Sequence, residues 1–319
     1  MHPAQNKLTK HLKATALIFL ALVLGLHFTQ QANAQTARGF VVSPPTIQFE
    51  LDPGARAEKV IKVTNNSAEA TEFVVNVQDF IVTDSKGTPE LLPEGFLPDN
   101  KYAASTWATV LPDRFTIQPG QSKTTTLYFQ VPGDARPGGK YVSVAFRPQT
   151  AGMPESSGAK INTVIGALVY LTVKGDITEK AQITQFSAPN FSEYGPIPFK
   201  TEVLNLGDLH INPKASVEVK DMLGRKVYSY ALDNINIFPG TSRIYQNSWE
   251  TKWLFGRFTT SITGYYGKDN NLPLTAIASF WVIPYKLITV ILLAVAIVIT
   301  ITFYLKKRNE PQEIVEEQN

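Results

Sequence analysis

The chain has 319 residues and no cysteine, with 30 lysines and arginines against 27 aspartates and glutamates. Disulfides are therefore excluded, and a chain of this length must be stabilised by the burial of an apolar core. The basic residues are dispersed, and residues 35–285 hold 23 charges of each sign, which argues against a nucleic-acid partner.

The first 34 residues have the composition of a secretory signal peptide. Three lysines precede a short apolar run, and an Ala-Asn-Ala triplet ends at Ala34. This pattern predicts cleavage between Ala34 and Gln35, with an uncleaved signal anchor as the alternative. The residues that follow are then exported from the cytoplasm.

From Gly39 to Pro284 the apolar residues recur with a period of two, which is typical of half-buried strands. In one such stretch Val142, Val144 and Phe146 are expected to face a core, and Tyr141, Ser143 and Ala145 a wetter side. Turns rich in Pro, Gly and Asn separate the stretches, and no helical period occurs among them. The pattern predicts an all-β fold built from sandwiches.

Two halves of this region share an order of landmarks. Each has an apolar strand that ends at an asparagine, Asn65 or Asn205, followed by a Pro-Gly turn at Gly120 or Gly240. The spacing is 55 residues in the first half (120 − 65) and 35 in the second (240 − 205). We expect two β-sandwich domains, at residues 38–177 and 178–284, the first with an insertion of about twenty residues near 85–104.

Residues 287–305 form a run of nineteen residues without charge, Pro or Gly. As a helix the run would span roughly 28 Å, which matches the apolar thickness of a bilayer. A basic cluster follows it and favours a cytoplasmic C-terminus, with residues 306–319 as the tail. The boundaries of this predicted membrane anchor are Lys286, Leu287, Leu305, Lys306, Lys307 and Arg308.

Few residues offer catalytic chemistry. Beyond the signal segment His210 is the single histidine, which does not support a Ser-His-Asp triad or a zinc site. No calcium loop or phosphate-binding glycine loop occurs. A distant pair of carboxylates for glycoside hydrolysis stays open. We expect a protein that is not an enzyme and that carries no cofactor or metal.

Aromatic residues provide the candidates for partner contact. The insertion carries Phe96 and Tyr102, and Trp107 follows it. Loops on rigid sandwiches commonly mediate recognition, so these three residues are the candidate contacts. Core packing is the plainer role for Trp107 and for five aromatic residues of the second domain, Trp249, Trp253, Phe255, Tyr265 and Tyr266.

The stretch Leu272 to Ala276 resembles the LPxTG signal that sortases recognise. The same residues also continue the alternation of Leu274, Ala276, Ala278 and Phe280, so we expect a strand there.

The first domain resembles the N-terminal domain of WxL-interacting proteins, which are surface proteins of Gram-positive bacteria. The matching pieces are Leu51-Asp52-Pro53-Gly54, Val63-Thr64-Asn65-Asn66-Ser67, Phe115 through Pro132 and Gly138-Gly139-Lys140-Tyr141. This resemblance implies two immunoglobulin-like domains between a signal peptide and a transmembrane helix. It also implies peptidoglycan as a partner of the first domain and a protein as a partner of the second.

A second resemblance, to the first domain of periplasmic pilus chaperones, rests on Trp107, Phe115 and Pro119-Gly120. The Arg–Lys pair with which those chaperones hold a carboxylate is missing. Our hypothesis is a single-pass plasma-membrane protein whose exported domains bind cell-wall polymer or secreted surface proteins, with one helix in the lipid. The alternative is a membrane-tethered chaperone for the assembly of secreted subunits.

Overall fold

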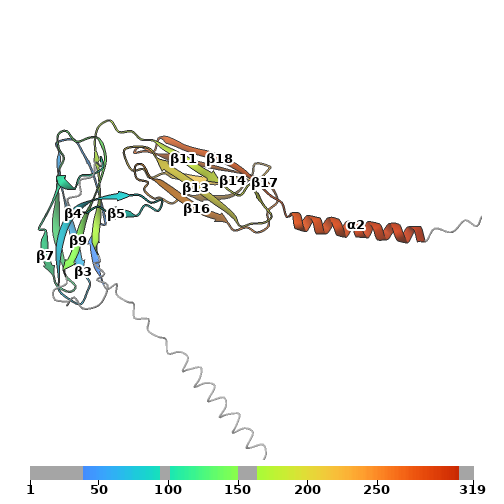
Figure 1. The fold of residues 1–319 in the computed structure, drawn as a ribbon, viewed down its shortest axis with the longest axis horizontal. Helices are drawn as coiled ribbons and strands as arrows, with labels where there is room; N and C mark the ends of the chain where they lie inside the picture. The colour runs from blue at the N-terminus through green and yellow to red at the C-terminus, as the bar shows by residue number, and fades with distance from the viewer. Residues whose placement is uncertain (1–38, 94–100, 150–163, 309–319) are drawn as a thin grey trace, which may run out of the picture.

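The structure is a computed structural model that describes residues 39–93, 101–149 and 164–308. Two β-sandwich domains follow one another, and an apolar helix extends from the second (Figure 1). The expected all-β fold, with two immunoglobulin-like sandwiches and a C-terminal helix, is confirmed. Ala34, Gln35 and Phe96 lie outside the described residues, as does the tail beyond Arg308.

The first domain packs two sheets face to face. Its elements are β1 (Phe40–Ser43), β2 (Thr46–Leu51), β3 (Arg56–Asn65), β4 (Thr71–Val82), β5 (Pro89–Leu91), the 3₁₀ turn η1 (Ser105–Trp107), β6 (Ala108–Leu111), β7 (Arg114–Ile117), β8 (Ser122–Gln130), β9 (Gly138–Gln149) and β10 (Ile165–Val173). One sheet has the order β1-β3-β8-β6, and the other β2-β10-β9-β4-β5 with β7 beside β4. Only β2 and β10 pair in parallel among these strands.

The second domain repeats this plan with fewer strands. Its strands are β11 (Ala181–Ser187), β12 (Phe191–Ser192), β13 (Ile197–Asn205), β14 (Lys214–Lys220), β15 (Lys226–Ala231), β16 (Ser242–Trp249), β17 (Gly256–Tyr266) and β18 (Leu272–Val282). The sheets have the orders β11-β13-β16 and β12-β18-β17-β14-β15. The stretch that resembles a sortase signal lies in β18, as the strand pattern predicts.

Alternation of apolar side chains places a core between the sheets of each domain. In the first domain Val63, Phe73, Leu127 and Phe146 have no exposed surface. The strand β9 departs from the expected alternation, because Tyr141, Ser143 and Ala145 are buried as well. The wetter face predicted for these three residues is wrong. For Tyr141 the reason is that its ring packs against Phe238 of the second domain, with ring centroids 4.9 Å apart.

The landmark asparagines of the two halves are buried and form the same hydrogen bonds. The Asn65 amide donates to the carbonyls of Glu69 (2.8 Å) and Ile117 (2.9 Å). The Asn205 amide donates to the carbonyls of Leu209 (2.8 Å) and Ile237 (2.9 Å). The backbone N–H groups of Gly120 and Gly240 donate to the carbonyls of Asn65 and Asn205, at 2.7 and 2.9 Å. The predicted internal repeat is therefore confirmed at equivalent atoms.

The extra residues of the first domain lie later than the expected 85–104. The hairpins β4–β5 and β14–β15 correspond, so residues 85–91 belong to a feature that both domains share. From the end of that hairpin to the carbonyl bonded by the asparagine there are 26 residues in the first domain (117 − 91) and 6 in the second (237 − 231). The additional residues follow β5 and include η1 and β6, which pairs with the outer edge of β8.

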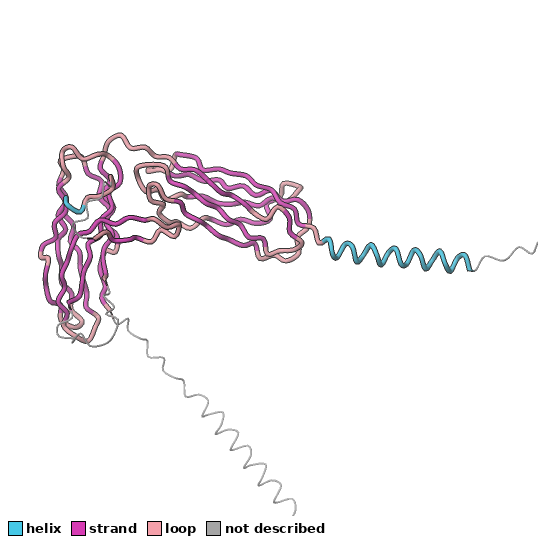
Figure 2. The backbone as a smooth tube through the Cα atoms, viewed as in Figure 1, coloured by secondary structure: helices cyan, strands magenta, loops and turns pink. Residues whose placement is uncertain are grey.

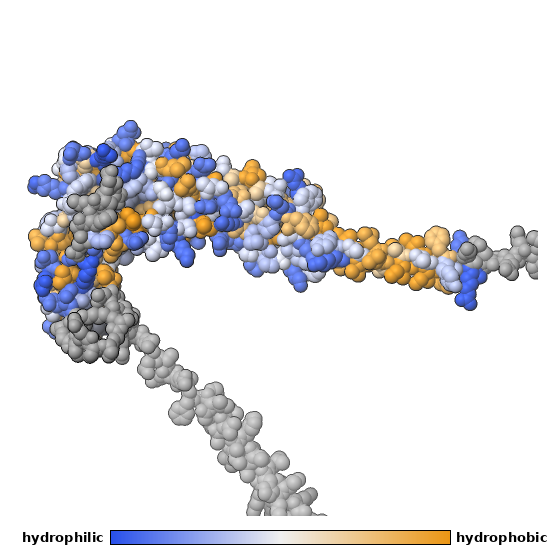
Figure 3. All heavy atoms as spheres, viewed as in Figure 1, coloured by the Kyte–Doolittle hydropathy of each residue, from blue (hydrophilic) through white to orange (hydrophobic). Residues whose placement is uncertain are grey.

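The helix α2 (Tyr285–Arg308) contains all six residues that bound the predicted anchor. Residues 285–306 have a mean hydropathy of 2.8, and none of the most apolar window is buried. By length and composition α2 is able to cross a bilayer, and its surface is apolar along nearly its whole length (Figure 3). Pro284 precedes the helix, where a missing N–H group has no cost.

The two domains meet at an angle, and α2 leaves the second domain at the end opposite to the first (Figure 2). The hairpin β4–β5 reaches from the first domain towards the second (Figure 1). At its tip Gly87 lies against the guanidinium group of Arg243, which leaves no room for a side chain there. Residues 174–180 connect β10 to β11.

We expect Asn65→Ala to lower the free energy of unfolding by about 2 to 3 kcal/mol, because buried carbonyl groups would lose their donors. The measurement is urea unfolding of the full-length chain in detergent micelles, followed by tryptophan fluorescence. Asn66→Ala is the matched control, since Asn66 is exposed, and it should change the value by less than about 0.5 kcal/mol. Equal effects of the two substitutions would contradict the role of Asn65.

Candidate functional site

The junction between the domains is built from aromatic rings of both. Phe80, Tyr141 and Tyr170 come from the sheet of the first domain that contains β9, and His210 and Phe238 come from loops of the second. Phe80 and Phe238 have centroids 5.8 Å apart, and Tyr170 and His210 5.0 Å. Edge-to-face contacts of this kind stabilise a junction beyond the apolar area that they bury.

A hydrogen bond crosses this junction. The backbone N–H of His210 donates to the Tyr141 hydroxyl at 2.8 Å, and the His210 Nδ1 atom lies 3.3 Å from the same oxygen. Burial raises the pKa of Tyr141, so its hydroxyl stays protonated. Burial also lowers the pKa of His210 to about 4, so its ring is neutral at neutral pH.

Charged pairs surround the aromatic junction on its exposed side. Lys101 and Asp208 are 2.7 Å apart, and Lys268 and Glu50 are 2.6 Å apart. The bonded ammonium group of Lys101 lowers the pKa of Asp208. The backbone of Gly139 also donates to the carbonyl of Asp208 at 2.8 Å. These contacts lie at the surface and therefore add orientation more than stability.

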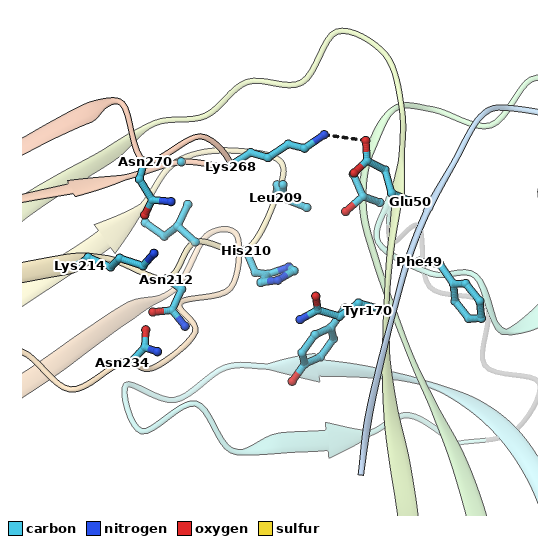
Figure 4. A pocket seen from close by; sticks show the side chains of 14 residues that line it. Phe49, Glu50, Tyr170, Leu209, His210, Asn212, Lys214, Asn234, Lys268 and Asn270 are labelled. Carbon is cyan, nitrogen blue, oxygen red and sulfur yellow. Dashed lines mark hydrogen bonds and ion pairs between the residues drawn. The ribbon is translucent and has the colours of Figure 1, made fainter. Parts of the chain in front are cut away.

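A cavity of about 460 Å³ opens beside the junction (Figure 4). Strand β2 and β10 form one wall, and loops of the second domain form the other. Its polar lining consists of Gln48, Glu50, Thr172, His210, Asn212, Lys214, Asn234, Lys268 and Asn270. Such a lining of amides with a neutral imidazole is suited to hydrogen bonding. Within the described ranges no three His, Asp or Glu side chains are grouped so that they could hold a metal ion.

The predicted contact residues have different surroundings. Tyr102 packs against Tyr141, with ring centroids 6.1 Å apart, and so belongs to the junction. Trp107 lies in η1, away from Tyr102 along the first domain. The Lys140 ammonium group links the two places, because it lies 5.7 Å from the Trp107 ring and donates to the carbonyl of Lys101. The structure therefore does not bring the candidates into one site.

Trp107 borders a groove of about 500 Å³ on the outer face of the sheet β1-β3-β8-β6. The other lining side chains include Arg56, Glu58, Thr109, Tyr128 and Gln130. Tyr128 is 42% exposed, and it lies between Glu58 and Thr109 in the cross-strand register.

The neighbouring row of this sheet is apolar. Val60 and Leu111 lie on either side of Thr126, and they are 55% and 56% exposed. Beyond Leu111 the outer edge of β6 has no paired strand among the described residues. We name Val60, Trp107, Leu111 and Tyr128, together with this edge, the distal face. The sequence carries one signal for it, since Tyr128 occupies the polar side of an alternating strand.

The aromatic residues that were expected in the second core divide into two groups. Trp249 and Tyr266 are buried, at 6% and 7% exposure. Trp253 and Phe255 are each 66% exposed, and Tyr265 is 52% exposed, so the expectation of core packing is wrong for these three. Trp253 and Phe255 lie between β16 and β17, where the strand alternation no longer applies.

No protein-family model matches the chain, and no curated protein sequence matches it. Among solved structures, the class 5 fimbriae chaperone CfaA is 15% identical, with 75% of this chain and 98% of that chain covered and a TM-score of 0.41. The E. coli chaperone DraB is 12% identical, with coverages of 77% and 98% and a TM-score of 0.35. The Pseudomonas aeruginosa CupB2 chaperone is 10% identical, with coverages of 74% and 98% and a TM-score of 0.34. At such identities a likeness concerns the fold and says nothing of function.

Acid is expected to destabilise the junction through His210. Its pKa is about 4 in the folded chain against 6.5 in the unfolded chain, so the unfolded chain binds the proton first as pH falls. Stability is therefore lost between pH 6.5 and pH 4, by up to roughly 3 kcal/mol. The measurement is the free energy of urea unfolding in detergent micelles across this range. His210→Asn keeps a neutral polar side chain and should show a smaller loss, whereas equal losses would contradict the role of His210.

Proposed function

We propose that the chain is a membrane-anchored, non-catalytic binding protein that engages a secreted or surface protein through its first domain. The sequence supports the location, because a signal segment precedes the domains and a basic cluster follows the apolar run of α2. The signal would place both domains outside the cytoplasm, and Lys306 and Arg308 would keep the C-terminus inside. The plasma membrane is the expected site.

The observation that carries this proposal is the distal face. It combines exposed apolar side chains, among them Val60, Leu111 and Tyr128, with the free edge of β6. A free edge offers backbone donors and acceptors to an added strand, and apolar side chains beside it supply pockets and buried area. A protein partner meets both needs, whereas a glycan meets neither edge nor row as well.

The geometry of the chain supports the same domain as the contact. The first domain lies at the end away from α2 (Figure 1). The aromatic junction around Tyr141 holds it in one orientation, so the distal face is preorganised relative to the anchor. Preorganisation lowers the entropy lost on binding.

The resemblance to WxL-interacting proteins supports a surface location. In that family the first domain is associated with peptidoglycan and the second with proteins. Cell-wall glycan is therefore the competing partner class for the first domain, and the next experiment separates it from a protein.

Tyr128→p-benzoylphenylalanine should give photo-crosslinked adducts with a defined secreted or surface protein in producing cells. The matched control is the same substitution at Tyr265, a 52% exposed tyrosine on a strand of the second domain. Adducts are measured by mass spectrometry after purification of the full-length chain. Val60→Lys should lower the yield several-fold, because it places a charge in the apolar row. Adducts that contain only glycan, or equal protein adducts from both positions, would contradict the proposal.

The alternative function is a membrane-tethered chaperone that accepts or donates a strand during assembly of secreted subunits. One observation favours it: β16 has no strand on its outer side in the described part of the chain. Its counterpart β8 in the first domain is covered there by β6. The second domain thus has a free edge at a position where the repeat itself accommodates an antiparallel strand.

If this alternative holds, a co-produced secreted subunit should slow deuterium exchange at alternate backbone amides of residues 242–249. Alternate amides are expected because only every second N–H group of an edge strand points to an added neighbour. The exchange of the buried strand β13 is the internal reference. Unchanged exchange in residues 242–249, in a complex that is shown to form, would contradict strand addition at β16.

A further inference from the structure

The end of the second domain next to α2 carries a group of exposed apolar side chains. They come from four separate segments: the turns at 188–196 and 221–224, the loop at 250–255 and the connection into the helix. Each is between 48% and 70% exposed, and they are Phe191, Met222, Leu223, Trp253, Phe255, Trp281 and Tyr285. We name this group the collar.

Contacts between the segments show that the collar is continuous. Phe191 is paired in register with Trp281, and its ring centroid lies 6.1 Å from that of Tyr285. Tyr194 and Trp253 have centroids 5.4 Å apart. The Met222 side chain lies over Gly256, which is paired with the last residue of β18.

The collar is too close to the start of α2 to lie far from any membrane that holds the helix. Strand β18 ends at Val282 and α2 begins at Tyr285, so two residues connect them. Two residues span at most about 10 Å even with the bonds at either end. The interfacial layer on each side of a bilayer is about 5 to 8 Å thick. The end of the domain must therefore touch or enter this layer.

The chemistry of the collar matches that layer. Tryptophan and tyrosine favour the boundary between headgroups and acyl chains, and lysine extends its ammonium group towards the headgroups. The Lys252 ammonium group lies over the Trp253 ring at 5.7 Å. The acidic side chains nearby are neutralised, because Glu193 bonds Lys286 at 2.8 Å and Asp221 bonds Arg225 at 2.7 Å.

We infer that the collar docks on the lipid bilayer surface and holds the second domain in one orientation on the membrane. The occupant is the interfacial layer of the same bilayer that would contain α2. This inference rests on the proposed function, because it needs the helix to lie in a membrane. It adds a second attachment, made by side chains that neither the core nor the junction uses.

Spin labels provide the test, because the chain has no cysteine and each single-cysteine variant has one attachment point. The full-length chain would be reconstituted in vesicles of equal parts phosphatidylcholine and phosphatidylglycerol. Labels would be placed at Phe255→Cys in the collar, Val295→Cys in α2 and Ile277→Cys as the matched control. Ile277 is 75% exposed on the same domain, outside the collar. The measurement compares relaxation by oxygen, which enters lipid, with relaxation by a nickel chelate, which stays in water.

The expected result is a several-fold higher ratio of oxygen to chelate accessibility at position 255 than at 277, with position 295 higher still. A label at 295 in lipid together with equal ratios at 255 and 277 would overturn the docking and leave the proposed function standing. A label at 295 in water would overturn the proposed anchor and the docking with it.

An independent variant tests the orientation. Trp253→Ser combined with Phe255→Ser removes two exposed rings, so the fold should be unaffected. In the same vesicles, the distribution of distances from a label at Val60→Cys to labelled lipid headgroups should become broader than in the parent chain. An unchanged distribution would contradict a collar that holds the domain.

Discussion

The burial of Tyr141 between the domains is the contact on which the arrangement of this chain depends. A phenol hydroxyl in apolar surroundings needs a hydrogen-bond partner, or its desolvation is a net cost. The backbone N–H of His210 provides that partner at 2.8 Å, while Phe238 and Tyr170 enclose the ring. The contact therefore requires one conformation of the loop that carries His210. Since β9 is central in its sheet, this single contact fixes the second domain against the middle of the first.

The alternation within strands could be predicted from the sequence because both faces of a strand are set by neighbouring residues. The burial of Tyr141 could not, because its cover comes from a loop 69 residues further along the chain. Asn65 and Asn205 were recognisable as repeated turn residues. Their burial was not, because an asparagine at a turn is commonly exposed, and here the decisive acceptor, the Ile117 or Ile237 carbonyl, comes from another segment.

The candidate sites show the same limit. Trp107 is conspicuous in the sequence, but the apolar row of Val60 and Leu111 exists only once the register of three strands is known. The expectation that Trp253 and Phe255 pack in a core extended the pattern of β16 beyond its end at Trp249. Periodicity carries information about burial only while the backbone stays extended and paired. Beyond that point the exposure of an aromatic ring depends on what lies across from it.

The position of the distal face follows from two constraints in series, the short connection at the membrane and the aromatic junction. If either were loose, the first domain would sample a large volume, and the concentration of its face at any one place would fall. A partner fixed in the same envelope experiences this loss fully, whereas a freely diffusing partner does not. The buried hydrogen bond of Tyr141 and the two-residue link before α2 thus act on one quantity. That quantity is the orientation of the distal face relative to the anchor, and a stationary partner is the kind that would need it.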